Sequence, residues 1–279
     1  MAELDYDYDF IIVGSGFGGS VSALRLAEKG YSVAVIEMGK RWRQLDYPKS
    51  NWIIHKYLWL PWMRCYGFFR MTLLKDVFIL SGTGVGGGSL VYANTLPIPK
   101  DEAWDDPVWR DLEDWKSVMP SFYATAKTML GVNTFPHRTL ADEIIHDYSK
   151  EIGTDDTFVP APLGVFFGEP GKEVPDPYFG GKGPSRAGCI QCGGCMVGCR
   201  HNSKNSLDKN YLYLAEQLGV KVVPETRVTS LEPSGEGGYE LSLERSTAYL
   251  FKRRRTMRAK QVILSGGVLG TVPLLLSCK

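Results

Sequence analysis

Six residues near the amino end have the types and spacing needed to bind a nucleotide pyrophosphate. Residues 14–19, Gly-Ser-Gly-Phe-Gly-Gly, match the pattern G-x-G-x-x-G. Gly14 permits a tight turn, Gly16 lets the backbone approach a pyrophosphate, and Gly19 allows close helix–strand packing. Glu37 lies roughly 20 residues further on, where a carboxylate can accept hydrogen bonds from ribose hydroxyls. An acid at this position argues against the extra phosphate of NADP.

A second glycine loop, residues 81–94, is harder to explain by folding alone. It contains three consecutive glycines, Gly86-Gly87-Gly88, before a predicted helix start at Ser89. Such a run lowers stability unless something needs the backbone at close range. Because N–H groups at a helix start can bind an anion, we expect this loop to present donors to an anion or to a flavin ring. A loop needed only for packing is the alternative interpretation.

The first glycine loop, residues 14–19, lies inside a predicted β-α-β unit. Apolar spacing predicts a strand at 10–13, a helix at 20–29 that Gly30 ends, and a strand at 32–37. The same criteria predict helices at 111–129 and 206–217, strands at 221–223, 228–231, 239–244 and around 249–255, and a strand from 261 that turns into a helix. Two irregular regions are predicted, at 41–80 and at 153–188. The basic run 252–255 is interpreted as the solvated end of a hairpin.

The composition indicates an ordinary globular protein. The chain has 279 residues, and its 32 Lys or Arg against 31 Asp or Glu give a net charge of +1, which argues against a nucleic-acid binder. Hydrophobic residues make up 44% and charged residues 23%, enough for a sizeable core. No stretch reaches the ~18 apolar residues of a membrane span. The acidic start, residues 1–7, lacks the basic region of a signal peptide, so we expect a cytoplasmic protein.

The carboxyl end predicts a longer protein. The run Leu274-Leu275-Leu276 lies in a predicted helix shortly before Lys279, the last residue. The apolar face of that helix would have nothing to cover it. We therefore expect this sequence to be the first half of a longer chain.

Four cysteines lie within eleven residues at C-x2-C-x2-C-x3-C spacing: Cys189, Cys192, Cys195 and Cys199. This spacing can surround an iron–sulfur cluster. Reduced thiols in a close-packed loop explain the same residues, and no metal ligand is assigned. The histidines lie outside all of these motifs and are interpreted as surface or packing residues: His55, His137, His146 and His201.

Both glycine loops lie in segments that resemble a known protein family. Residues 11–20, 84–94, 192–199, 204–206, 210–212 and 262–267 resemble the glucose–methanol–choline (GMC) oxidoreductases, in particular their bacterial cholesterol-oxidase-like branch. The resemblance implies an α/β fold, a Rossmann-like FAD-binding domain with irregular insertions and part of a substrate or cap region, without the carboxyl-terminal half. It divides the chain into a first part of the FAD-binding domain (5–135), a Pro/Gly/Cys-rich insertion (136–204) and a returning part (205–279).

The resemblance also implies FAD bound in an extended form. The first glycine loop would serve its pyrophosphate, Glu37 its ribose and the backbone at Val228 its adenine, with the second loop near pyrophosphate and flavin. The implied cofactor-binding residues are Gly14, Gly16, Phe17, Gly18, Gly19, Glu37, Gly87, Gly88, Ser89, Asn94 and Val228. Tyr92-Ala93-Asn94 departs from the Asn-Gly-Gly of steroid oxidases, which weakens an assignment to cholesterol itself.

The implied reaction is hydride removal from an alcohol carbon to the flavin, which oxygen or another acceptor then reoxidises. The substrate would be a small hydrophobic alcohol such as a sterol. The family's proton-handling His lies in its carboxyl-terminal half, so no catalytic residue is assigned here. Three alternatives stay open: an FAD-binding fragment that needs a partner chain, an iron–sulfur electron-transfer flavoprotein, and an NAD enzyme.

An aromatic stretch from Trp52 to Phe69 contains basic residues as well. Interfacial Trp and Tyr with basic neighbours are typical of membrane-surface segments. One hypothesis is therefore a lid that touches a membrane and admits an apolar alcohol. The alternative is an irregular segment packed on the flavin domain. Vesicle sedimentation of the wild type and of a variant with Trp59→Ala and Trp62→Ala would distinguish the membrane lid from the packed segment.

Overall fold

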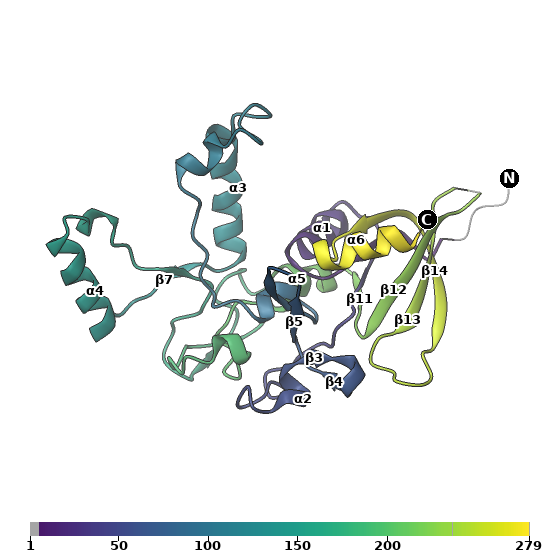
Figure 1. Ribbon diagram of the computed structural model, residues 1–279, viewed down its shortest axis with the longest axis horizontal. Coiled ribbons are helices and arrows are strands. Elements are labelled where there is room, and N and C mark those ends of the chain that lie inside the picture. The colour runs from purple at the N-terminus through teal and green to yellow at the C-terminus, as the bar shows by residue number, and fades with distance from the viewer. Residues whose placement is uncertain (1–5, 236, 279) are drawn as a thin grey trace.

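A six-stranded sheet positions both glycine loops. The computed structural model describes residues 6–235 and 237–278. The strands follow the order β11–β2–β1–β14–β13–β12 (Figure 1), with the bounds β1 (Tyr8–Val13), β2 (Val33–Ile36), β11 (Lys221–Val223), β12 (Thr226–Pro233), β13 (Tyr239–Arg245) and β14 (Arg254–Leu264). The first four of that order pair in parallel and the last two antiparallel. The predicted α/β, Rossmann-like architecture is confirmed.

Both faces of the parallel strands are covered, which explains why β2 and residues 10–13 of β1 are continuous apolar runs. Three helices provide the cover: α1 (Phe17–Glu28), α5 (Tyr211–Gln217) and α6 (Val268–Ser277). Successive strand residues point to opposite faces, so Ile12 packs with Leu24 of α1 and Leu212 of α5. Ile11 packs on the other face, in a cluster with Leu274 of α6.

Strand β14 differs from its prediction. The sequence predicts two separate strands, around 249–255 and from 261, whereas the structure has one strand of 11 residues, Arg254–Leu264. Its first half pairs antiparallel with β13 and its second half pairs parallel with β1, and Ala259 pairs with both. The charged residues in the middle of the strand, Arg258 and Lys260, hide its continuity, because their exposed side chains interrupt the apolar pattern.

The region 41–80, predicted to be irregular, contains two hairpins. Its elements are α2 (Ile54–Tyr57), β3 (Trp59–Leu60), the 3₁₀ helix Pro61–Met63, β4 (Cys65–Tyr66), β5 (Phe69–Leu73) and β6 (Phe78–Gly82). Most of its aromatic side chains are packed rather than free. Phe68 is fully buried, and Trp42 and Tyr47 meet its ring edge-on at 5.2 and 5.3 Å between centroids.

Two helices project away from the sheet (Figure 1). Helix α3 (Trp115–Met129) begins at Asp114, whose carboxylate accepts a hydrogen bond from the Ser117 N–H; the predicted start at 111 was too early. Helix α4 (Leu140–Glu151) was not predicted. Its start carries a capping box in which Thr139 and Asp142 bond each other's backbone N–H groups, and this pattern could have revealed it.

The remaining elements are short. They are 3₁₀ helices at Gly87–Leu90, Asp101–Asp105, Asp155–Thr157, Cys195–Val197 and Leu207–Lys209, and strands β7 (Asn133–Thr134), β8 (Pro162–Leu163), β9 (Glu173–Val174) and β10 (Arg186–Ala187). Among the described residues, no helix has both the length and the apolar character to cross a membrane. The predicted domain boundaries stay predictions. The residues 1–5 of the acidic start, Glu236 of the predicted turn and Lys279 lie outside the described residues.

Candidate functional site

The two glycine loops, distant in sequence, touch each other. A Cβ atom on Gly87 would lie 2.7 Å from the Gly16 Cα, closer than side-chain contacts allow. The Ser15 hydroxyl donates to the Gly84 carbonyl at 3.3 Å and accepts from the Gly86 N–H at 3.1 Å. Only glycine at position 87 lets the backbones approach this closely, and its φ of +52° also favours glycine.

Two glycines of the first loop are required by packing. A Cβ on Gly14 would lie 2.4 Å from the Ser265 carbonyl oxygen, and one on Gly19 would lie 2.0 Å from the Gly14 carbonyl oxygen. Gly16 differs, because a Cβ there would meet no atom within 4 Å. The backbone at Gly16 is therefore open toward a ligand, and the start of α1 behind it can present N–H groups to an anion.

A cavity of about 1730 Å³ borders both loops. The predicted cofactor-binding residues on its wall are Gly14, Gly16, Phe17, Gly18, Glu37, Gly87, Gly88 and Val228. Drug-sized ligands occupy pockets of roughly 300–1,000 Å³, so this cavity has room for a dinucleotide and a substrate. The open backbone at Gly16, the acid at Glu37 and the cavity volume fit an extended dinucleotide cofactor.

Glu37 is buried at the end of β2 and already engages the chain's own donors. Its carboxylate accepts from the Ser15 hydroxyl at 2.6 Å, the Ser15 N–H at 3.1 Å and the Gly39 N–H at 2.8 Å. Burial raises the pKa of Glu37, and these hydrogen bonds oppose that shift. Glu37 thus holds the first glycine loop in place, in addition to facing the cavity where a ribose would lie.

Three predicted residues do not line the cavity: Gly19, Ser89 and Asn94. The Ser89 hydroxyl donates to the Gly86 carbonyl at 2.7 Å and accepts from the Leu207 N–H at 3.0 Å, so it closes the second loop. Asn94 is buried with a φ of +69°, and its side-chain oxygen has no hydrogen-bond partner among the described residues. The expected contact of these three residues with the cofactor stays a prediction.

The turn after β14 lines the cavity and was not among the predicted site residues. Ser265, Gly266 and Gly267 lie on the wall, next to the start of α6. Gly267 has a φ of +65°. The sequence could have identified these site residues, because this segment repeats the strand–glycine–helix arrangement of the first loop.

Tyr92 also lines the cavity and was not predicted. Its ring meets Phe17 edge-on, with 6.1 Å between the ring centroids. Its hydroxyl is buried without a hydrogen-bond partner among the described residues. Burial raises the pKa of Tyr92.

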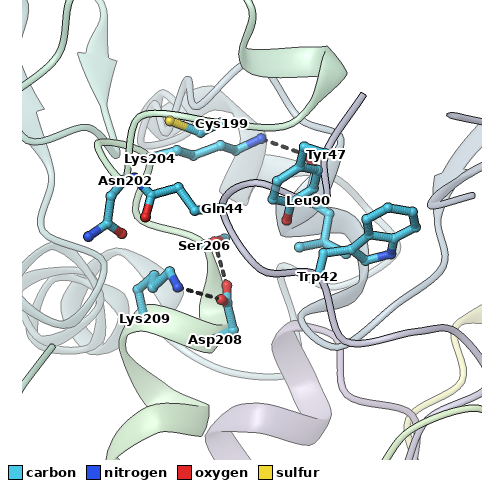
Figure 2. Close-up of a pocket in the computed structure, with 10 residues that line it drawn as sticks. All are labelled: Trp42, Gln44, Tyr47, Leu90, Cys199, Asn202, Lys204, Ser206, Asp208 and Lys209. Atoms are coloured by element: carbon cyan, nitrogen blue, oxygen red, sulfur yellow. Dashed lines mark hydrogen bonds and ion pairs between the residues drawn. The ribbon is translucent and has the colours of Figure 1, made fainter. Parts of the chain in front are cut away.

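Lys204 is a buried cation behind the second glycine loop (Figure 2). Its ammonium donates to the carbonyls of Leu90 at 3.0 Å, Tyr92 at 2.8 Å and Cys195 at 3.1 Å. It also lies 4.7 Å from the centre of the Tyr92 ring. Burial lowers the pKa of Lys204 to about 8. Lys204 thus joins the wall of the cavity to the cysteine run.

A small pocket of about 20 Å³ borders Lys204, and Figure 2 shows its lining. Asp208 accepts from the Ser206 hydroxyl at 2.5 Å and pairs with Lys209 at 3.2 Å. This volume is close to that of a single water molecule. The pocket is a packing feature rather than a substrate site.

The cysteine run lies near this region with free thiols. Among the described residues, no three His, Cys, Asp or Glu side chains are placed so that they could hold a metal ion. Two cations, Lys204 and Arg186, are buried nearby, and Arg186 donates to the Asn202 and Asn205 side chains. Of the four thiols, Cys192 is exposed and Cys189, Cys195 and Cys199 are half-buried. None of the four histidines lines the large cavity.

Comparison with known proteins agrees with this geometry. The family model described as GMC oxidoreductase matches residues 185–278, and the model described as NAD(P)-binding Rossmann-like domain matches residues 12–42. A cholesterol oxidase of Acinetobacter baumannii is 48% identical over 99% of this chain and 51% of its own length. A cholesterol oxidase of Mycobacterium tuberculosis is 49% identical over 96% of this chain and 47% of its own length.

More distant proteins are similar as well. A long-chain-alcohol oxidase of Arabidopsis thaliana is 24% identical over 96% of this chain and 34% of its own length. The solved structure of an FAD-dependent oxidoreductase from Chaetomium thermophilum aligns with a TM-score of 0.62 at 19% identity, covering 96% of this chain and 47% of the other. The chain spans about half the length of the curated relatives it matches. With the GMC oxidoreductase model matching residues 185–278 and a Rossmann-like model matching residues 12–42, the chain carries a GMC oxidoreductase domain and is similar to the cholesterol oxidases over nearly all of its own length.

Proposed function

We propose that the large cavity holds FAD in an extended form and that the protein takes part in oxidation of the CH–OH group of a hydrophobic alcohol, such as a sterol. The observation that carries this proposal is the contact between the two glycine loops beside the 1730 Å³ cavity. The sterol as substrate is supported by the printed names of the relatives that are almost half identical to this chain.

The chain's own residues would bind and orient the cofactor. The open backbone at Gly16 and the start of α1 suit the pyrophosphate. Glu37 faces the cavity where it can meet the ribose, and Val228 of β12 lines the part of the wall that suits the adenine. The rings of Phe17 and Tyr92 give that wall an apolar surface.

FAD held by these residues would supply the redox chemistry of the reaction, the acceptance of a hydride and the transfer of electrons to oxygen or another acceptor. Apolar side chains on the cavity wall, such as Phe17 and Tyr92, would help to keep water from the reacting carbon. No described residue on that wall is a histidine, so no proton-handling group is assigned to this chain. The family resemblance implies that the proton-handling histidine lies in the half of the relatives' sequence that this chain does not match.

A flavin-binding chain that needs a partner for catalysis is the second candidate. The observation that favours it is the share of the relatives covered, about half. The iron–sulfur alternative has no support from the placement of the described cysteines. An NAD enzyme remains an outcome to test, and the cytoplasmic location stays a prediction.

Purified protein reconstituted with FAD separates these candidates. We expect a yellow protein whose heat-released supernatant contains FAD, and whose colour bleaches under nitrogen when a sterol or a long-chain alcohol is added. Yellow protein that bleaches with no alcohol would favour the partner-dependent candidate. Well-folded protein that binds NADH and releases no flavin would contradict the proposal.

A further inference from the structure

The hairpin of β5 and β6 has polar side chains on its half-buried face. Residues opposite each other on an antiparallel pair share a face, and neighbours along a strand point to opposite faces. By this register, the half-buried face of the hairpin consists of Arg70, Thr72, Ile79 and Ser81. The other face is exposed and wholly apolar, and it consists of Met71, Leu73, Phe78 and Leu80.

This distribution is the reverse of an ordinary antiparallel hairpin, which turns its apolar side chains inward and its polar ones to water. All four residues of the half-buried face line the large cavity. Three residues of the apolar face, Met71, Leu73 and Leu80, belong to the lining as well, so polar and apolar groups meet in this part of the wall. Packing alone would favour apolar residues on the inner face, because burial of polar groups without hydrogen-bond partners is costly. The polar face therefore suits a polar group that a ligand brings into the cavity.

Arg70 is the cation of the half-buried face. Its guanidinium forms no hydrogen bond or ion pair with any residue in the ranges 6–235 and 237–278. The other charged residues that line the cavity have partners, because Glu37 accepts hydrogen bonds from the first glycine loop and Arg227 pairs with Glu244. A guanidinium offers a planar fork of N–H donors that matches a carboxylate or a phosphate. Arg70 is thus available to bind an anionic group inside the cavity.

We propose that Arg70 binds the carboxylate of the substrate, so that the substrate class is an amphipathic hydroxy acid with an apolar body between its alcohol and its carboxylate. The hydroxyls of Thr72 and Ser81 lie on the same face as Arg70 and add hydrogen-bond donors for such a group. Apolar side chains of the adjoining wall, among them Leu60 and Leu80, suit the body of the substrate. The inference rests on the proposed function and narrows its substrate class.

The pyrophosphate of FAD is the other anionic group that the proposed function brings into the cavity. It has donors of its own at the first glycine loop, where the backbone at Gly16 is open and the start of α1 presents N–H groups. Arg70 belongs instead to a separate two-stranded sheet outside the six-stranded one. We therefore assign Arg70 to the substrate, and the experiment measures its effect on the cofactor separately.

Calorimetric titration of the FAD-reconstituted protein under nitrogen tests this assignment. One ligand is ω-hydroxydodecanoate, and the other is the α,ω-diol of the same chain length, which differs only in one end group. We expect the hydroxy acid to bind at least about tenfold more tightly than the diol, because hydrogen bonds between charged groups are among the strong ones. The FAD retained after gel filtration is measured in the same preparations, so failure of the proposed function and failure of this inference are separate readouts.

Variants at position 70 identify the group responsible. Arg70→Gln should bind the hydroxy acid no more tightly than the diol, while its affinity for the diol and its retained FAD stay at wild-type values. Arg70→Lys keeps the charge without the planar fork and should keep part of the preference. The matched control is Arg253→Gln, because Arg253 is exposed and does not line the cavity. It should bind both ligands like the wild type, and all variants should keep the wild-type thermal midpoint.

Three results would each overturn the inference. The first is a wild-type protein that binds the hydroxy acid no better than the diol, or binds neither. The second is an equal loss of the preference in Arg70→Gln and in the Arg253→Gln control, which would assign it to the overall charge of the protein. The third is an Arg70→Gln variant that keeps the preference but loses FAD; this would assign the guanidinium to the cofactor's pyrophosphate.

Discussion

Lys204 shows how one residue can fix the wall of the cavity. Its ammonium satisfies three buried carbonyls, two of them from the second glycine loop. Hydrogen bonds to charged groups contribute about 1.5–3 kcal/mol each, and unpaired buried groups are costly. We expect Lys204→Met to lower the free energy of unfolding by about 3 kcal/mol, measured by urea titration. Lys172→Met is the control, because Lys172 is exposed and pairs with the exposed Glu169; a loss of similar size there would contradict this role.

The pKa of Lys204 gives a pH dependence with a defined sign. Its pKa falls from 10.5 to about 8 on folding because of burial, while Cys195, Cys199 and Asp208 oppose that shift. Between these two values the unfolded chain binds more protons than the folded chain, so the free energy of unfolding rises with pH. We expect the difference in unfolding free energy between wild type and Lys204→Met to grow between about pH 8 and pH 10. A difference that shrinks over this range would contradict the assignment.

Glu37 supports the first glycine loop through its two carboxylate oxygens. In Glu37→Gln the amide group would face the N–H of Ser15 or Gly39, which leaves a buried donor unpaired. We expect a loss of about 1–3 kcal/mol in unfolding free energy and weaker FAD retention on gel filtration. Glu143→Gln on the exposed part of α4 is the control and should change neither quantity. Unchanged stability in Glu37→Gln would show that the loop does not need this carboxylate.

At the scale of elements, the contact between the two glycine loops decides the site. Gly87→Ala would place a methyl group against the Gly16 backbone at a φ of +52°. We expect it to lower the unfolding free energy by at least 1 kcal/mol and to abolish FAD retention. Gly88→Ala should leave stability unchanged, because a Cβ there meets no atom within 4 Å. Thermal unfolding of both variants checks this, and equal midpoints would contradict the steric argument.

The success of sequence-based prediction also differs between elements. The β-α-β unit and its loop were predicted correctly because a strand, a glycine turn and an amphipathic helix are set by local spacing. Helix α4 was missed although its capping box lies in the sequence. Strand β14 was split in two because half of it lies on an exposed, charged part of the sheet.

At the scale of the whole molecule, Ala259 joins the parallel and antiparallel halves of the sheet. It is fully buried and pairs with Tyr8 of β1 and Tyr239 of β13. Ala259→Leu would overpack this position, and such changes cost about 1–3 kcal/mol. The exposed Ala103 provides the control as Ala103→Leu, which should stay within about 0.5 kcal/mol of wild type. Urea unfolding measures both, and a neutral Ala259→Leu would mean that the sheet has room at this position.

The sequence by itself determined the Rossmann-like unit, the two glycine loops and the resemblance to FAD oxidoreductases, because glycine spacing and apolar periodicity are local properties of the chain. Only the tertiary structure decided that Gly87 touches Gly16, that Ser89 and Asn94 turn away from the cavity, and that Lys204 is buried behind the second loop. The contact between the Arg64 guanidinium and the Tyr249 ring is likewise seen only in the tertiary structure. These contacts join residues far apart in the chain, and they depend on how whole elements pack, which short-range patterns do not encode.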